Sequence, residues 1–545
     1  MVPLIIGKAF ARESSCDVQH IVICELSSSA EQKLCFDERA MTVCPTLSVL
    51  ELEQFELLKP RLAVLWDTVF PGDEESYTSV IVPSLTLDQT EMAKIAGMPF
   101  YEERLLFLLM RLRNPQARVV YVTSQPIHPM VLDYYLQLLI GIPASHARAR
   151  LTLLCAYDSS PRPLTEKILE RPRLLARIRA SIIDPERAYL TVFNSTPLEV
   201  RLCVRLGIPI NAPDPRLAIW GTKSGSRRLF RETGVEQPAG FEDLHSLEEV
   251  VGALLSLHTR RPSIRCALLK LNEGFSGEGN AVFTYPDAPD PAAIRDAMSR
   301  LQFSVAVETA ASYLEKFEHG GGIVEELIEA KEVRSPSVQI RINPRREVLL
   351  ASTHEQIMGG STGQLFLGCL FPAADDYRCE MQRLGIRVAE ALAEKGVIGR
   401  FSVDFLATRN SPETSWRLTA IEVNLRMGGT THPMLALRFL TGGQLDRATG
   451  LLFAPDGGTK YYRASDNVQS ERYRGLLPED LIEIITANRL GFNHRTGTGV
   501  LFHMIGAVSQ FGKFGMIAIG DNRDEADRLF ATTIDVLDRE SGRTQ

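Results

Sequence analysis

The strongest constraint on the fold is a pair of segments, Gly399–Thr408 and Arg417–Arg426, in which apolar and polar residues alternate. Alternation with period two is typical of strands with one buried face. The residues between them, Asn410–Ser415 (NSPETS), have the composition of a turn. The two segments are therefore predicted to pair as an antiparallel hairpin that packs on one side.

This hairpin would bring two acidic residues together. If it is symmetric about Glu413, Asp404 lies opposite Glu422, and Ser402 lies opposite Asn424. Directly opposed Cβ atoms are only ~4.5–5.5 Å apart, and two carboxylates at that separation repel each other unless a cation lies between them. Hard oxygen ligands suit Mg²⁺, so Asp404, Glu422 and Asn424 are predicted metal ligands. The alternative is that one acid is protonated or faces solvent.

Composition limits the classes of protein to consider. The 545 residues suggest three or four domains. The formal net charge of −7 argues against a nucleic-acid coat or a binder of anionic membranes. No apolar run approaches the ~18–20 residues of a transmembrane helix, and the N-terminus does not have the pattern of a signal peptide. The nine cysteines form no C-x-x-C motif, which favours reduced thiols and a cytoplasmic location.

The N-terminal region alternates short β-rich runs with amphipathic stretches, which predicts a parallel α/β sheet. It contains no G-x-G-x-x-G motif, and a helix is expected at Tyr101–Asn114. Breaks at Ile208–Pro215 and Ala454–Gly458 divide the chain, and the tail is expected to end in a helix over Asp524–Glu540. The predicted strands are Ile21–Leu26, Leu62–Asp67, Ser79–Leu85, Ala117–Ser124, Arg150–Asp158 and Arg187–Phe193.

Two lysines precede the predicted hairpin. Lys223 opens a predicted helix that ends at Gly234. Lys270 ends a predicted strand and is followed by a glycine-rich loop, in which backbone N–H groups could wrap phosphates. An ordinary hairpin loop explains the glycines equally well. The candidate phosphate-binding residues of this loop are Gly274, Ser276, Gly277 and Gly279.

Two further segments complete the set. An apolar strand that begins at Gly322 ends in acidic residues. Their backbone could hydrogen-bond to the edge of an adenine base, but taken singly the acids are better explained as a solvent-exposed strand edge. The loop after Asn424 offers free backbone N–H groups, Arg426 and His432, and suits an acyl-phosphate or tetrahedral intermediate. His432 could be a general base, but before a proline it is better explained as a structural or substrate-orienting residue.

In this order, the motifs resemble those of the ATP-grasp ligases over about Gly221–Pro433. The phrases KLNEGFSGEGN, SPSVQ and EVNLRMGGTTHP are particularly similar to the pheganomycin-type peptide ligase group. The resemblance implies a parallel-sheet α/β domain (1–215), an ATP-grasp core of two α+β subdomains (216–452) and a small α+β C-terminal domain (453–545). It also implies ATP and Mg²⁺ as cofactors.

The resemblance also implies roles for individual residues. Lys223 and Lys270 would contact the ATP phosphates, under the loop Gly274–Gly279. Many family members have an arginine two residues before the first metal-binding aspartate, where this chain has Ser402. Arg341, Arg426 and Arg400 are the candidates to replace it, and Arg341 and Arg426, with Lys270, are the predicted catalytic residues. The implied nucleotide and metal ligands are Glu325, Glu326 and Ile328 for adenine, Glu332 for ribose, and Asp404, Glu422 and Asn424 for Mg²⁺.

The implied activity is an ATP-dependent carboxylate–amine ligase that works through an acyl-phosphate, in small-molecule or peptide biosynthesis. Its partners would be a small carboxylic acid and an amine, with no nucleic acid or membrane, and a homodimer is a further expectation. The alternatives are a small-molecule kinase on the same nucleotide site and a nucleotide-binding regulatory protein without turnover. Neither the acid nor the amine can be identified from the sequence.

Overall fold

The computed structural model describes residues 46–542, apart from 70–74, 88, 93–94, 275–278, 304–307, 360–362 and 364. All of these residues belong to one compact unit. The strand expected at Ile21–Leu26 lies outside the described residues. Within them, no helix combines the length and the apolar character that crossing a bilayer requires.

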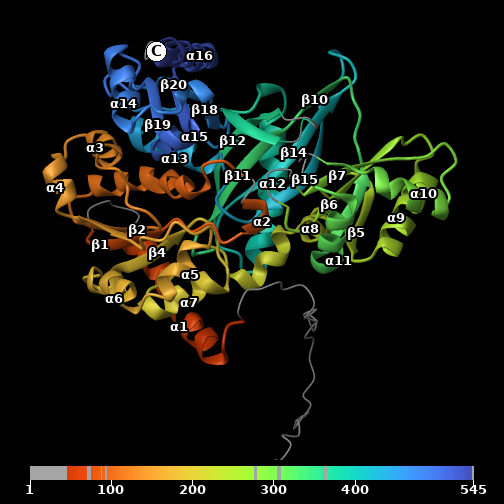
Figure 1. Cartoon of the computed structure of the whole chain (residues 1–545), viewed down its shortest axis with the longest axis horizontal. Coiled ribbons are helices and arrows are strands. Elements are labelled where there is room, and N and C mark those ends of the chain that lie inside the picture. Colours follow the sequence, from red (N-terminus) through yellow and green to blue (C-terminus); the bar gives the residue numbers. More distant parts are fainter. Residues whose placement is uncertain are drawn as a thin grey trace, which may run out of the picture. The chain divides into compact units, whose positions relative to one another are not determined.

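The N-terminal region contains the predicted parallel sheet, in the strand order β3-β2-β1-β4. Figure 1 labels β1, β2 and β4 of this sheet. The strands of this sheet confirm four of the predicted runs, and helices separate them along the chain. The strands are β1 (Tyr77–Val82), β2 (Ala117–Thr123), β3 (Leu151–Cys155) and β4 (Ala188–Val192). The helices are α1 (Val49–Val69), α2 (Gln89–Met92), η1 (Met98–Arg113), α3 (Pro129–Gln137), α4 (Ala144–Arg148), α5 (Leu164–Leu169), α6 (Pro172–Ala180), η2 (Pro185–Arg187) and α7 (Pro197–Leu206).

Two local predictions in this region need correction. The strand expected at Leu62–Asp67 is wrong, because these residues lie in α1. The buried residues of α1 are spaced by three or four positions, which is the stripe of an amphipathic helix, and a six-residue apolar run taken alone cannot show it. The helix expected at Tyr101–Asn114 is present as η1, but it is a 3₁₀-helix that is buried on nearly all sides. The buried stripe of α1 is Phe55, Leu58, Leu62, Leu65 and Val69.

A five-stranded antiparallel sheet follows, in the order β5-β9-β6-β7-β8. Its apolar face packs on α9, and Val250, Leu254, Leu269 and Phe283 lie in that core. The elements from the end of the first region onward are η3 (Pro215–Gly221), α8 (Lys223–Thr233), β5 (Gly240–Leu244), α9 (Leu247–Arg260), β6 (Cys266–Leu271), β7 (Asn280–Thr284), α10 (Pro291–Ala297), η4 (Met298–Arg300), β8 (Gln302–Phe303), α11 (Ala310–Gly320) and β9 (Gly322–Glu326).

The largest sheet has eleven strands, all of them paired antiparallel. One face packs on α12, and Val338, Val403 and Val388 lie in the same buried core. The order β10-β14-β11-β12-β13-β18 forms its centre. The strands are β10 (Glu332–Arg334), β11 (Pro336–Ile342), β12 (Val348–Gly359), β13 (Leu365–Phe371), β14 (Gly399–Arg409), β15 (Arg417–Asn424), β16 (Gln444–Leu445), β17 (Leu452–Phe453), β18 (Thr459–Gln469), β19 (Gly499–His503) and β20 (Lys513–Gly520).

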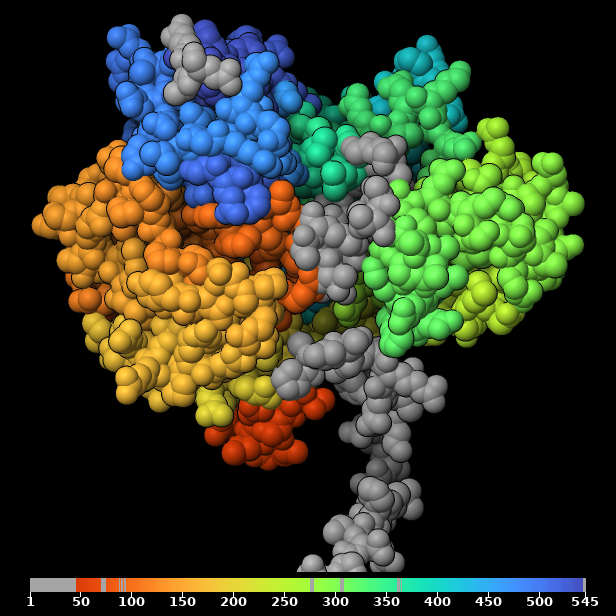
Figure 2. All heavy atoms as spheres, viewed as in Figure 1, coloured from red at the N-terminus to blue at the C-terminus, as the bar shows by residue number. Residues whose placement is uncertain are grey.

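The C-terminal segment continues this sheet, because β18 pairs with β13 and β20 pairs with β18. It also packs on the N-terminal region: the Tyr135 hydroxyl donates to the carbonyl of Phe502 over 3.2 Å, and side chains of both regions lie against each other (Figure 2). The predicted domain limits at residues 215 and 452 stay predictions. The remaining helices are α12 (Asp375–Glu394), α13 (Thr431–Thr441), η5 (Glu471–Tyr473), α14 (Pro478–Ala487), η6 (Ile505–Ala507), α15 (Val508–Phe511) and α16 (Arg523–Ser541).

A buried histidine links strands β12 and β18 of the large sheet. His354 on β12 lies with its Nε2 2.6 Å from the hydroxyl of Tyr462 on β18, beside the ring of Phe371. Burial lowers the pKa of His354 to about 3. The imidazole is therefore neutral in the folded protein at neutral pH.

This histidine makes folding sensitive to acid. The pKa of an unfolded histidine is ~6.5, so below that pH the unfolded chain binds a proton that folded His354 does not bind. His354 therefore makes the free energy of unfolding fall as the pH drops through 6.5, by ~2 kcal/mol between pH 7 and pH 5. We expect His354→Gln to lose less stability over this interval, measured as the urea midpoint at both pH values. The exposed His319→Gln is the control, and equal losses in wild type and His354→Gln would contradict the prediction.

Candidate active site

The predicted hairpin is present as β14 and β15. Asp404 pairs with Glu422 and Ser402 pairs with Asn424, which confirms the predicted register at the end that carries the acids. A bulge next to Asp404 shifts the pairing by one residue toward the turn. The Asn424 amide Nδ2 donates to Asp404 Oδ2 over 3.0 Å and to Glu422 Oε1 over 2.6 Å. One amide therefore holds both carboxylates in one group.

The two carboxylates differ in their pKa. Burial and the neighbouring Glu422 carboxylate raise the pKa of Asp404 to about 6, against the donation from Ser337 Oγ over 2.6 Å. Burial acts to raise the pKa of Glu422 too, but the Lys223 ammonium, paired with it, outweighs burial and holds that pKa at about 2. Lys270 also lowers the pKa of Glu422. The group is a concentrated set of oxygen donors whose mutual repulsion a cation would relieve.

Lys223 reaches this group from the first residue of α8. Thr222 caps the helix through Gly225 N, and Gly234 ends it in the left-handed conformation, as predicted. A Cβ on Gly225 would lie 1.8 Å from the carbonyl oxygen of Ile219, so only glycine lets α8 begin this close to η3. The Ser224 N–H donates to Asn272 Oδ1 over 3.0 Å, which ties the start of α8 to the loop after β6.

Lys270 lies near the end of β6, where the sequence predicted a strand. Its ammonium pairs with the Glu325 carboxylate of the neighbouring strand β9, and Arg227 Nη1 lies 3.2 Å from the same carboxylate. Both lysines are buried, and each already has an acidic partner. Each pairing holds an ammonium group at a fixed place, where an anionic ligand can compete with the carboxylate for it.

The glycine-rich loop is described in part. Gly274 and Gly279 lie close together, and a Cβ on Gly279 would be 2.8 Å from the Cα of Gly274. The pairing of β6 with β7 makes this segment a hairpin. Ser276 and Gly277 lie outside the described residues.

The predicted nucleotide residues lie from the end of β9 to the start of β10, and their side chains have different surroundings. The Glu325 side chain turns to Lys270, and the Glu326 carboxylate accepts from Ala239 N over 2.8 Å. Ile328 is half-buried in the segment between β9 and β10. Glu332 pairs with Arg409 over 2.8 Å, and this partner lowers the pKa of Glu332. The carboxylates are therefore held by the protein, while the backbone of this segment stays the predicted adenine contact.

The two arginines predicted to be catalytic, Arg341 and Arg426, lie in different places. Arg426 follows β15, and its pKa is lowered by burial while Glu422 and Asp404 act to raise it, so it lies within electrostatic reach of both carboxylates. Arg341 lies on β11 opposite Arg400, four residues beyond the partner of Asp404, or ~13 Å along the strand. The structure brings only Arg426 to the carboxylates.

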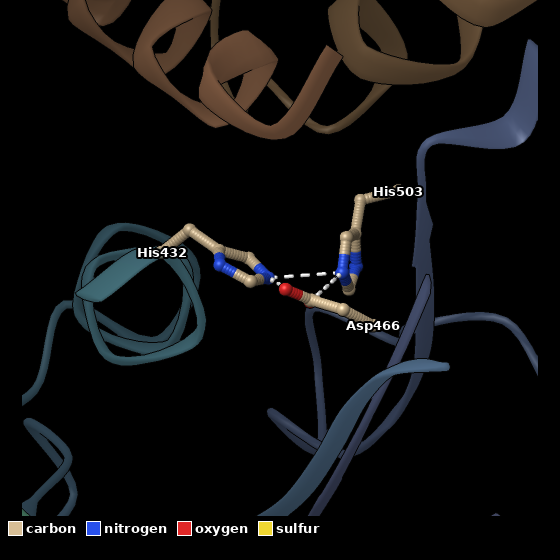
Figure 3. A group of neighbouring side chains, drawn as sticks. All are labelled: His432, Asp466 and His503. Atoms are coloured by element: carbon tan, nitrogen blue, oxygen red, sulfur yellow. Dashed lines mark hydrogen bonds and ion pairs between the residues drawn. The ribbon is translucent and has the colours of Figure 1, made fainter. Parts of the chain in front are cut away.

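His432 belongs to a separate buried cluster (Figure 3). Its Nε2 lies 3.0 Å from His503 Nε2 and 3.4 Å from Asp466 Oδ1, and His503 Nε2 lies 2.7 Å from the same oxygen. Three such atoms could meet a metal ion. However, Arg104 already lies 3.1 Å from the other Asp466 oxygen, and Lys513 adds a second positive charge nearby. We therefore assign the cluster to neutralising Arg104, and His432 to a structural role.

Sequence reasoning missed several residues that shape this region. Arg104, Asp466 and His503 come from three distant segments, and no spacing in the sequence connects them. Ser337 had a signal: Ser337, Gln339 and Arg341 alternate with apolar residues on β11, which marks a second polar strand face beside that of β14.

Comparison with known proteins gives the family. A family model described as IQCH-like ATP-grasp matches residues 216–287 and 293–448, which include both lysines and the acidic hairpin. The chain carries an ATP-grasp domain. The resemblance to ATP-grasp enzymes is thus confirmed, and the narrower pheganomycin-type group stays a prediction. A second model, the PGM1 C-terminal domain, matches residues 480–533.

Two curated proteins are similar to this ATP-grasp chain. L-propargylglycine–L-glutamate ligase of Streptantibioticus cattleyicolor is 29% identical over 458 residues, covering 83% of this chain and 92% of that protein. IQ motif-containing protein H of Danio rerio is 24% identical over 574 residues, covering 95% of this chain. The match spans only 53% of the Danio rerio protein.

Solved structures support the fold class. A biotin carboxylase complex from Campylobacter jejuni aligns with a TM-score of 0.51 and 14% identity, covering 85% of this chain and 91% of that one. At this identity the likeness concerns the fold alone. The predicted class, a parallel-sheet α/β region followed by α+β ATP-grasp and C-terminal regions, is confirmed. Residues 216–287 and 293–448 carry the ATP-grasp match, and one similar curated protein is a ligase.

Proposed function

We propose that this protein is an ATP-dependent carboxylate–amine ligase that forms ADP. The proposal rests on one cluster, in which Asp404, Glu422 and Asn424 lie together and Lys223 pairs with the Glu422 carboxylate. Lys270 also lowers the pKa of Glu422. Phosphoryl transfer from ATP needs this combination, because it depends on positioning and on neutralising the phosphate charge.

The donor set fits magnesium. Two carboxylates and one amide offer hard oxygen atoms, and Mg²⁺ takes one or two carboxylates while phosphates and water fill its other positions. Asp404, Glu422 and Asn424 would hold the ion. When bound, it supplies charge neutralisation at the ATP phosphates. Its positive charge would also favour the ionised form of Asp404, whose pKa is otherwise raised to about 6.

The reaction proceeds in two steps that balance. One oxygen of the acid substrate attacks the γ-phosphorus of ATP, the bond to the β-phosphate oxygen breaks, and ADP leaves. The amine then attacks the acyl carbon and loses a proton, and phosphate leaves with the oxygen of the original carboxylate. Lys223 and Lys270 stabilise the phosphate charge in the first step, and Arg426 steadies the transferred group. This scheme requires no covalent nucleophile from the chain.

The ligase relative supports this reaction class. Its name describes the ligation of two amino acids, L-propargylglycine and L-glutamate, which joins an acid to an amine. We infer a small acid and a small amine as the substrates here, with a role in small-molecule or peptide biosynthesis. A homodimer and a cytoplasmic location remain predictions from the sequence.

The test is ADP formation from Mg-ATP with pools of amino acids and small carboxylic acids. A ligase requires both an acid and an amine, and with ¹⁸O in the acid it transfers one ¹⁸O to the released phosphate. ADP formation with a stable phosphorylated product and no amine requirement would identify a kinase instead. Binding of ATP without turnover on any pool would count against the ligase and favour a regulatory protein.

The proposed ribose contact gives a smaller effect. If Glu332 accepts from the ribose hydroxyls, Glu332→Gln should raise the KM for ATP ~10-fold and leave kcat nearly unchanged, since a charged hydrogen bond contributes ~1.5–3 kcal/mol. Arg409→Gln removes the present partner of Glu332 and is the matched control. An unchanged KM in Glu332→Gln would remove this residue from the nucleotide site.

A further inference from the structure

Two polar side chains of β11 face the acidic hairpin from the neighbouring strand. Ser337 lies opposite Asp404, and Gln339 lies opposite Ser402. Residues two apart on a strand point to the same face of a sheet, and the Ser337 hydroxyl donates to Asp404 Oδ1 over 2.6 Å. Gln339 therefore leaves the sheet on the face that carries the carboxylates, and no step of the proposed reaction uses it.

The Gln339 side chain joins this strand to the start of α13. Its amide Nε2 donates to the hydroxyl of Thr431 over 3.0 Å and also to the hydroxyl of Thr430. All three residues are buried. A buried hydrogen bond is not easily exchanged for one to water, so these contacts fix the point at which the preceding loop ends and the helix begins.

Thr431 extends this contact into the loop between β15 and α13. Its hydroxyl oxygen also accepts from Gly428 N over 3.0 Å, and its own N–H donates to the carbonyl of Gly428 over 3.0 Å. The loop is further confined at Gly429, where a Cβ would lie 2.7 Å from Cε1 of Phe366. A chain of hydrogen bonds from Gln339 through Thr431 to Gly428 thus determines the path of this loop.

This loop carries groups that suit a negatively charged intermediate. Arg426 lies at its start, where its N–H donates to the carbonyl of Asn424 over 2.8 Å. In the described part of the chain, the N–H groups of Gly429 and Thr430 donate to no protein acceptor. Neighbouring N–H groups can bind an oxygen on which negative charge develops. They can do so only if the loop holds them in place, because a displacement of ~1 Å can cost about 10²-fold in rate.

We propose that Gln339 is a positioning residue of the ligase reaction. By holding Thr430 and Thr431, it keeps the N–H groups of Gly429 and Thr430 directed at the acyl group while the amine attacks. This inference rests on the proposed ligase function and assigns the step that the loop serves. A displaced loop would also let water attack the acyl carbon. Phosphate would then leave, the acid would be regenerated, and ATP would be consumed without formation of the amide.

A purely structural role is the other explanation for these hydrogen bonds, which could serve only to attach α13 to the sheet. However, α13 is already anchored by its apolar face, because Met434, Leu437 and Leu440 lie in a buried core together with residues of β18 and η1. The two explanations predict different results. A structural role predicts a less stable protein with unchanged turnover per folded molecule, whereas positioning predicts slower turnover that wastes ATP.

The test compares two substitutions of a buried glutamine by methionine. Gln339→Met keeps the length of the side chain and removes its hydrogen bonds, and Gln382→Met, in α12, is the matched control. We expect Gln339→Met to lower kcat for amide formation ~10²-fold and to leave the KM for ATP within about twofold of wild type. ADP should exceed amide in this variant, whereas wild type and Gln382→Met should form them in equal amounts.

Thr431 allows the contact to be tested from its other end. Thr431→Ser keeps the hydroxyl and should retain most of the wild-type kcat. Thr431→Val removes the hydroxyl and should resemble Gln339→Met, so it carries the test if Gln339→Met is unstable. Because the two side chains act as one unit, the double variant should lose less activity than the product of the two single losses. Losses that multiply independently would contradict the proposed chain of hydrogen bonds.

Amide hydrogen exchange provides a readout that does not depend on the reaction. In ligand-free Gln339→Met, exchange in residues 425–431 should be ~10-fold faster than in wild type, while exchange in α12 and β14 stays unchanged. Unchanged exchange in residues 425–431, or unchanged kcat with equal amounts of ADP and amide, would overturn the proposal. Faster exchange throughout the fold would show a structural role and overturn it too. ADP formation by wild type without an amine would instead count against the ligase function, whatever the exchange shows.

Discussion

Replacing Glu422 with glutamine is expected to lower ADP formation by about 10³-fold, the largest effect on activity that the site predicts. The substitution keeps the shape and the contact with Asn424, but it removes the carboxylate that pairs with Lys223 and that faces Asp404. The ion would lose a charged ligand, and Lys223 would lose the partner that fixes its position. The measurement is the initial rate of ADP formation at saturating Mg-ATP, acid and amine.

The matched control lies in the same hairpin. Glu413 is an exposed residue of the turn between β14 and β15, and its carboxylate accepts a hydrogen bond from the Ser411 hydroxyl. Glu413→Gln should retain the wild-type rate. Circular dichroism would check that both variants are folded. A rate for Glu422→Gln within tenfold of wild type would show that this carboxylate does not hold the ion, and the proposed site would have to be rebuilt around other residues.

The largest effect on stability is expected at Asp466. Arg104 and Asp466 are both buried, and Asp466→Ala leaves the guanidinium without its carboxylate next to His432 and His503. Removing one partner of a buried ion pair costs about 3–5 kcal/mol, because the remaining charge is uncompensated. The urea midpoint should fall accordingly.

An exposed pair in the same region provides the comparison. Asp527 and Arg463 lie 3.2 Å apart with side chains 38% and 34% exposed, so Asp527→Ala should cost about 1 kcal/mol or less. If Asp466→Ala gives too little folded protein, the double variant Arg104→Met/Asp466→Ala should recover part of the stability. A small effect of Asp466→Ala, equal to that of Asp527→Ala, would contradict the assignment of this cluster.

The acidic hairpin could be predicted from sequence because its determinants are local. The turn composition of Asn410–Ser415 and the alternation in both strands indicate the hairpin, and the register sets which side chains oppose each other. The bulge next to Asp404 could not be predicted from this pattern. The helix that begins at Lys223 was equally accessible, since Thr222 and Gly234 are its caps. The ordered set of motifs then indicated ATP-grasp enzymes, a family that the comparisons support.

Other features depend on contacts between distant segments. Arg104, Asp466 and His503 meet only after η1, β18 and β19 have packed together, so no window of sequence contains their relation. The error at Leu62–Asp67 has the opposite origin, because a short apolar run was considered without the helical stripe around it.

The continuity of the large sheet limits how the molecule can be divided. A fragment that ends at residue 448, with the ATP-grasp match, would contain every residue proposed to hold nucleotide and metal. It would lack β18, and the N–H and C=O groups of β13 that now bond to that strand would face water. Such a bare edge invites pairing with another chain, so this fragment would aggregate rather than act as a minimal enzyme. The domain that precedes the C-terminal segment therefore needs this segment in order to fold without aggregating.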